Sequence, residues 1–143
     1  MLLEKLYSIY KIDMEREGIT CSFERVIAWQ KANTFALMAY RATQNFPIEE
    51  RYGLCSQFQR AAVSIPANIA EGYKKVSKAD KLRFFNITQG SRNYILFTRD
   101  LGYISLDEFD KLKKALEEAS MFLNSYCRGI INNNGVKDQC GGN

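Results

Sequence analysis

The stretch AAVSIPANIAEGYKK, residues 61–75, decides the fold because it suits two different structures. A proline in mid-run, followed by Gly-Tyr-Lys-Lys, would fit a broken helix around a binding loop. The apolar residues nevertheless keep helical spacing on both sides of Pro66, with Ala62 and Ile65 before it and Ile69 after it. A loop has no reason to preserve that phase. We therefore predict one helix, kinked at Pro66, where the ring removes the hydrogen bond to the Ala62 carbonyl.

Four long blocks of the chain share this helical spacing, and the sustained alternation of a strand occurs nowhere. The clearest stripe is the last one, formed by Phe109, Leu112, Leu116, Ala119, Leu123, Tyr126 and Ile130. We therefore predict an all-α fold, an antiparallel up-down-up-down four-helix bundle over residues 19–131. Short loops are expected near Pro47, Val76 and Tyr103.

Start and stop signals flank these blocks. The patterns S-x-x-D at 77–80 and S-x-x-E at 105–108 predict capping boxes that open the third and fourth helices. Ser22 is expected to cap the first helix. Pro47 is expected to close it, since the residue before a proline avoids helical angles.

Two absences limit the chemistry open to this chain of 143 residues, a length that suits one domain. It has no histidine, which excludes imidazole-based catalysis and metal sites that need imidazole. Its four cysteines lie 34, 72 and 13 residues apart, unlike a zinc site or a disulfide framework. EGYKK lacks the strand and the spacing of a phosphate-binding loop. We therefore predict that the protein is not an enzyme, with no catalytic residues, metal ligands or cofactor.

The two ends of the chain differ from its centre. Residues 1–18 could form a short amphipathic helix or a loose arm, and they lack the apolar core of a secretory signal. Residues 132–143 are rich in Gly and Asn and are predicted to be disordered. No apolar run approaches the roughly 20 residues of a membrane span. A cytoplasmic protein is expected.

Positive charge is concentrated in one segment. Residues 73–99 contain seven basic residues and one acid, a local charge of +6 that leaves −2 for the rest of the chain. Such a stripe could neutralise phosphates along RNA or DNA. The more common reason for charged residues on a helix is a polar face exposed to solvent. Tyr73 and Tyr94 could stack on unpaired bases, but packing within the fold is the more ordinary role. The candidate nucleic-acid-binding residues are Lys74, Lys75, Lys78, Lys81, Arg83, Arg92 and Arg99.

The second helix also carries residues whose expected role is structural. Asn68 and Glu71 share one face and are predicted to form a polar network between helices. Val63, Pro66 and Ala70 form an apolar face beside the main stripe, which favours a homo-oligomer interface.

Four motifs resemble a known family: WQKA at 29–32, AAVSIPANIAEG at 61–72, RFFNITQGS at 83–91 and LGYIS at 101–105. They are similar to the four-helix-bundle proteins encoded by intervening sequences of bacterial 23S ribosomal RNA genes, over residues 22–131. Compared with that family, about four residues are missing between Ser91 and Leu101, close to one helical turn. The motif residues expected to be structural are Trp29, Pro66, Asn68, Glu71, Gly72, Gly102 and Tyr103.

The resemblance implies a bundle that assembles into a ring, typically of five subunits, with no established enzymatic activity. The family is also similar to the accessory variability determinant of diversity-generating retroelements, which works with a reverse transcriptase and nucleic acid. Binding to RNA or DNA is therefore the leading expectation for this chain. The alternative is a protein-interaction adaptor, for example an accessory subunit of a reverse transcriptase.

Overall fold

The computed structural model describes residues 23–73 and 76–132, which contain four α-helices and no strand. This confirms the all-α prediction. The helices are α2 (Ile27–Thr43), α3 (Leu54–Glu71), α4 (Lys78–Asp100) and α5 (Leu106–Asn132), with two short 3-10 turns, η1 (Phe23–Arg25) and η2 (Ile48–Glu50). The predictions for residues 1–18 and for the tail from residue 133 onward lie outside the described residues.

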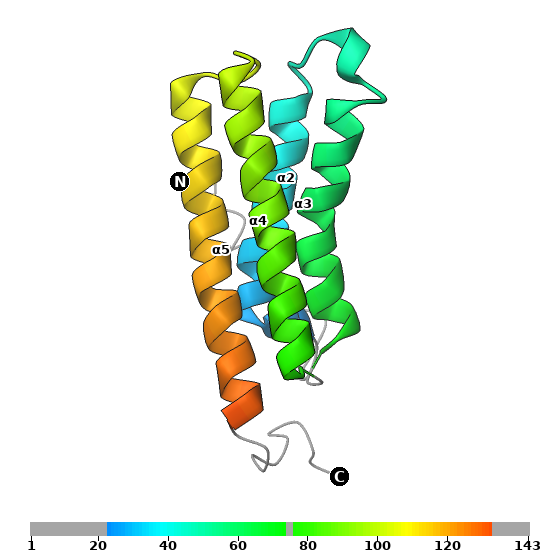
Figure 1. Cartoon of the computed structure of the whole chain (residues 1–143). Coiled ribbons are helices and arrows are strands. Elements are labelled where there is room, and N and C mark those ends of the chain that lie inside the picture. Colours follow the sequence, from blue (N-terminus) through cyan, green and yellow to red (C-terminus); the bar gives the residue numbers. More distant parts are fainter. Residues whose placement is uncertain (1–22, 74–75, 133–143) are drawn as a thin grey trace, which may run out of the picture.

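The four helices surround one core. α2 packs against α3 and α5, and α4 packs against the same two helices. Figure 1 shows the α2–α3 and α4–α5 connections at the same end of the bundle. Five residues of the last predicted stripe are buried, namely Phe109, Leu112, Leu116, Ala119 and Leu123. The largest apolar side chains that are fully buried are Phe35, Phe58, Ile65, Ile69, Ile95 and Leu112. Burial of these apolar side chains is the main force that holds the helices together.

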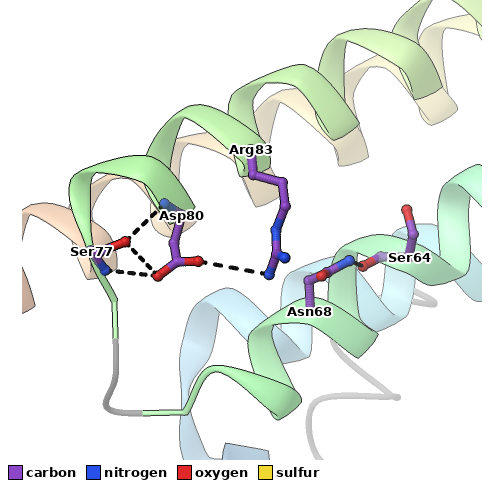
Figure 2. Close-up of polar contacts among 5 residues, drawn as sticks. All are labelled: Ser64, Asn68, Ser77, Asp80 and Arg83. Atoms are coloured by element: carbon purple, nitrogen blue, oxygen red, sulfur yellow. Dashed lines mark hydrogen bonds and ion pairs between the residues drawn. The ribbon is translucent and has the colours of Figure 1, made fainter.

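Both capping boxes are confirmed. Ser77 Oγ accepts a hydrogen bond from the Asp80 N–H at 3.2 Å, and the Ser77 N–H donates to Asp80 Oδ2 at 2.9 Å (Figure 2). Ser105 and Glu108 make the same reciprocal pair, at 3.1 and 3.2 Å. α4 and α5 therefore begin immediately after these serines, because the pairs satisfy backbone N–H groups that a helix start leaves open.

The predicted limits of the first helix were wrong. α2 begins at Ile27 with the extended Val26 as its N-cap, five residues after Ser22, because the 3-10 turn η1 comes first. It ends at Thr43, four residues before Pro47, which instead stands at the N-cap of η2. Pro47 therefore begins the following turn and does not itself close α2.

Pro66 lies inside one continuous helix, so the loop alternative is excluded. It is buried, not part of an outward apolar face. Two side-chain hydrogen bonds lie next to it. Ser64 Oγ donates to the Ala61 carbonyl at 2.6 Å. Asn68 Nδ2 donates to the Ser64 carbonyl at 2.6 Å, and both of these residues are drawn in Figure 2. The Ser64 hydroxyl and the Asn68 amide thus form hydrogen bonds with backbone carbonyls in the turn where Pro66 has no N–H to donate. These bonds stay within α3 and do not form the interhelical network that we predicted.

Candidate nucleic-acid interface

A groove of about 730 Å³ lies between α4 and α5. Its floor is apolar and belongs to the core, with buried side chains from both helices. These are Phe84, Ile95, Phe109, Leu116, Leu123 and Cys127. Burial raises the pKa of the Cys127 thiol, and the charge of Lys81 opposes that shift only in part. The floor is therefore a nonpolar environment in which a nearby charge is poorly screened.

Basic side chains line the groove. Lys78, Lys81 and Arg92 come from one face of α4 and belong to the predicted set. Lys113 comes from α5 and was not predicted. Its nearest acid in the groove lining is Glu117, with 3.9 Å between Lys113 Nζ and Glu117 Oε1. α5 mixes both signs of charge around this lysine, so charge balance along the sequence gives no signal for it.

Arg83 and Arg99 are not among the residues that line the groove. Arg83 extends from α4 towards α3 in Figure 2, and its guanidinium lies 3.8 Å from Asp80 Oδ1. Arg99 pairs with the neighbouring Asp100 at 2.9 Å and lies over the Phe109 ring, 4.6 Å from its centroid. The structure therefore divides the predicted basic stripe into a groove face and two arginines that already have partners within the chain.

Asp80 is the single acid of the basic segment. Its pKa is lowered, first because the Ser77 backbone N–H donates to its carboxylate and then because the Ser77 hydroxyl does so. Asp80 does not line the groove, and its carboxylate contacts Ser77 at the start of α4 and Arg83. Its charge still raises the pKa of Cys127 in the floor. Lys74 and Lys75 lie outside the described residues.

Of the two tyrosines considered for base stacking, Tyr94 packs between helices. Its hydroxyl lies 3.4 Å from Gln57 Oε1, and its ring lies 6.1 Å from the Phe58 ring, so it contacts α3. Tyr73 is half-buried just after the end of α3. Tyr94 therefore contributes to helix packing.

The remaining motif residues occupy structural positions. Trp29 is half-buried and meets the Phe23 ring edge-on, with 5.3 Å between centroids. Glu71 is the exposed last residue of α3, and Gly72 is its C-cap, with an N–H that donates to the Asn68 carbonyl at 3.0 Å. Gly72 thus lies at the end of the helix, which is a structural position.

The described residues contain neither a cluster of metal ligands nor a membrane-spanning helix. Over 23–73 and 76–132, no three His, Cys, Asp or Glu side chains come together in a way that could hold a metal ion. Among the helices of these residues, none combines the length and the apolar character that a membrane crossing requires.

Comparison with known proteins identifies the family of this chain. The model of the family described as 23S rRNA-intervening sequence protein matches residues 24–125, which include α2, α3, α4 and most of α5. A search among curated proteins found no match. The match includes all four sequence motifs and both walls of the groove, and the chain belongs to the 23S rRNA-intervening sequence protein family.

Proposed function

We propose that this protein binds RNA or DNA without catalysing a reaction, through the basic walls of the α4–α5 groove. One observation carries the proposal. Four cationic side chains, Lys78, Lys81, Arg92 and Lys113, line the groove, whose described lining contains one acid, Glu117. A cationic groove attracts polyanions because each neutralised phosphate releases condensed counterions. The family name is consistent with a nucleic-acid setting, although being encoded within a ribosomal RNA gene does not make a protein a ribosomal component.

The proposal predicts a specific dependence on salt. Four phosphate contacts correspond to a slope of about −3.6 for log K against log salt with a duplex, and about −2.8 with a single strand. Affinity for an oligonucleotide, measured by fluorescence anisotropy from about 50 to about 200 mM salt, should therefore fall steeply.

Arg92→Gln and Arg83→Gln form a matched pair, because both remove one charge from α4 but only Arg92 lines the groove. Arg92→Gln should weaken binding and reduce the salt slope by about 1, whereas Arg83→Gln should leave the slope unchanged. Equal effects of the two substitutions, or an affinity that does not respond to salt, would overturn the proposal.

The proposal extends to the assembly, as the family resemblance implies. We propose that five subunits form a ring. Within each subunit the helices run antiparallel and α3 bends at Pro66, and the protein is located in the cytoplasm. Exposed Ile27, Tyr40 and Val63 on α2 and α3 offer apolar surface on the two helices that do not form the groove. Native mass spectrometry tests the ring, and a monomer at micromolar concentration would contradict it.

An adaptor function is the second candidate, and a different surface favours it. Ile48 and Tyr52 in the α2–α3 connection and Leu106 at the start of α5 are all exposed, at the same end of the bundle (Figure 1). A partner such as a reverse transcriptase could bury them. This function predicts that a protein partner still co-purifies after nuclease treatment. It also predicts that the double variant Tyr52→Ser, Leu106→Ser no longer co-purifies with that partner. Loss of co-purification after nuclease treatment would oppose this function.

A further inference from the structure

Three large apolar side chains are exposed in the α4–α5 groove. Leu82, Phe85 and Met121 have 62%, 58% and 61% of their surface accessible. Contacts with phosphate require none of them, and their exposure to water is unfavourable in proportion to their area. An exposed apolar cluster inside a site is a sign that the ligand covers it. The ligand of this groove should therefore carry apolar surface as well as negative charge.

Phe85 lies between cations on the same face of α4. Lys78 is seven residues before it and Arg92 is seven residues after it, which is close to two helical turns in each direction. At about 1.5 Å per residue, each cation is about 10 Å from Phe85 along the helix axis. Lys81 lies one turn before the ring, and Lys113 lines the facing wall. An aromatic face is thus flanked by positive charge along the groove.

Polar side chains complete the groove lining. Gln89 and Asn124 have amides that can both donate and accept hydrogen bonds, and Ser120 adds a hydroxyl group. Thr88 is buried, and its hydroxyl donates to the Phe85 carbonyl at 2.8 Å. A base has an apolar face, an edge with donors and acceptors, and a phosphate nearby, so one nucleotide could use all three kinds of side chain. A docked apolar helix would leave the amides and the cations without partners.

We infer that the groove binds single-stranded RNA or DNA, with an unpaired base stacked on Phe85 and neighbouring phosphates at Lys81 and Arg92. This inference rests on the proposed function and names its substrate class. A duplex keeps its base faces inside the stack, so it could use the cations but would leave Phe85 exposed. Single strands offer the same charge together with free base faces.

Phe97 provides a matched control for Phe85. Both phenylalanines are on α4 and exposed, Phe97 at 52%, but Phe97 does not line the groove. The test compares wild type, Phe85→Ala, Phe85→Trp and Phe97→Ala by fluorescence anisotropy at one salt concentration. The probes are oligo(U) and oligo(dT) of about 12 nucleotides and a blunt duplex of equal length, within the site sizes of single-strand binders. Circular dichroism melts verify that each variant is folded.

Wild type should bind the single strands more tightly than the duplex. Phe85→Ala should weaken single-strand binding by about 5- to 150-fold, the equivalent of one stacked base, with little effect on the duplex. Phe85→Trp should retain the affinity, and Phe97→Ala should match wild type.

Several outcomes separate this inference from the function on which it rests. If Phe85→Ala leaves single-strand affinity unchanged while Arg92→Gln weakens it, the inference is wrong and the proposed function stands. If no oligonucleotide binds, both are wrong. If Phe85→Ala changes self-association in light scattering but not oligonucleotide affinity, the groove is a protein contact and the inference is overturned.

Discussion

The Tyr103 hydroxyl donates a hydrogen bond to Glu50 Oε1 at 3.1 Å, although the two residues lie 53 positions apart. The second oxygen of the same carboxylate, Glu50 Oε2, accepts the Leu54 N–H at 3.1 Å, where α3 begins. The Tyr103 ring also packs on Phe46, with 5.3 Å between centroids. One carboxylate therefore joins the α2–α3 connection to the α4–α5 connection at one end of the bundle (Figure 1).

Tyr103→Phe should remove this link and make stability depend less on alkaline pH. Burial first, and then the hydrogen bond to Glu50, raises the pKa of Tyr103 above its ordinary value of 10.0. A group whose pKa is raised on folding contributes stability below its unfolded pKa and loses that contribution as pH rises through its folded pKa. We expect Tyr103→Phe to lower Tm by about 3 °C at pH 7, with the difference from wild type shrinking as pH rises above about 10 and through the higher pKa of the folded state.

Tyr52→Phe is the control for this experiment, because Tyr52 lies near the same end of the bundle but is 89% exposed. Circular dichroism melts at pH 7 and about pH 11 measure both variants. A Tm difference for Tyr103→Phe that persists unchanged at the higher pH would contradict the prediction.

Gly102→Ala and Gly90→Ala should change stability in opposite directions. An added Cβ meets nothing within 4 Å at either glycine, so only the backbone distinguishes them. Gly102 has a φ of 73° and lies two residues after the end of α4, with its N–H donating to the Arg99 carbonyl at 2.9 Å. Alanine there should cost about 1–2 kcal/mol, because the left-handed conformation is strained for an L-residue. Gly90 lies inside α4, where alanine should add about 1 kcal/mol.

Urea denaturation of the two variants measures these changes. Gly102→Asn provides a further comparison, since asparagine tolerates the left-handed region better than alanine does. Equal stability of Gly102→Ala and wild type would show that the turn after α4 does not need this conformation.

Ser91→Ala should stabilise the protein. Ser91 is fully buried on α4, and its Oγ has no hydrogen-bond partner among the described residues. Removing a buried, unpaired hydroxyl should raise the free energy of unfolding by about 1 kcal/mol. Thr98→Val is the matched comparison, because Thr98 Oγ1 is also buried but donates to the Ile95 carbonyl at 2.9 Å, so its loss should destabilise by about 1 kcal/mol. Urea denaturation distinguishes the two signs, and a destabilised Ser91→Ala would contradict the prediction.

The elements that local sequence predicted well are those whose signals act over three or four residues. The reciprocal bonds at Ser77 and Ser105 need only partners three residues away, and both helix starts were predicted correctly. The limits of α2 were missed, because η1 lies between Ser22 and the start of the helix, and Pro47 begins η2 four residues after the helix ends. Those turns pack against α2 or α3, so they depend on contacts beyond their own residues.

Charge along the sequence could not identify the groove. Arg83 and Arg92 contribute equally to the basic segment, yet nine residues are two and a half helical turns and place them on opposite sides of α4. Which side meets α5 depends on how the helices pack. Lys113 and Met121 join the groove from a helix that begins beyond the basic segment, so only packing brings them to Arg92 and Phe85.

The sequence by itself determined four helices, the capping boxes of α4 and α5, the continuous helix through Pro66 and the membership of the family. The helices and the capping boxes follow from spacing and hydrogen bonds over a few neighbouring residues, and the family follows from the order of its four motifs. Only the tertiary structure decided that Lys78, Lys81 and Arg92 face Lys113 across an apolar floor, while Arg83 and Arg99 pair elsewhere. Each wall of the groove is one helix, and the rotation of that helix about its axis decides which side chains line the groove. This rotation is set by the burial of the apolar face of the helix against its neighbours.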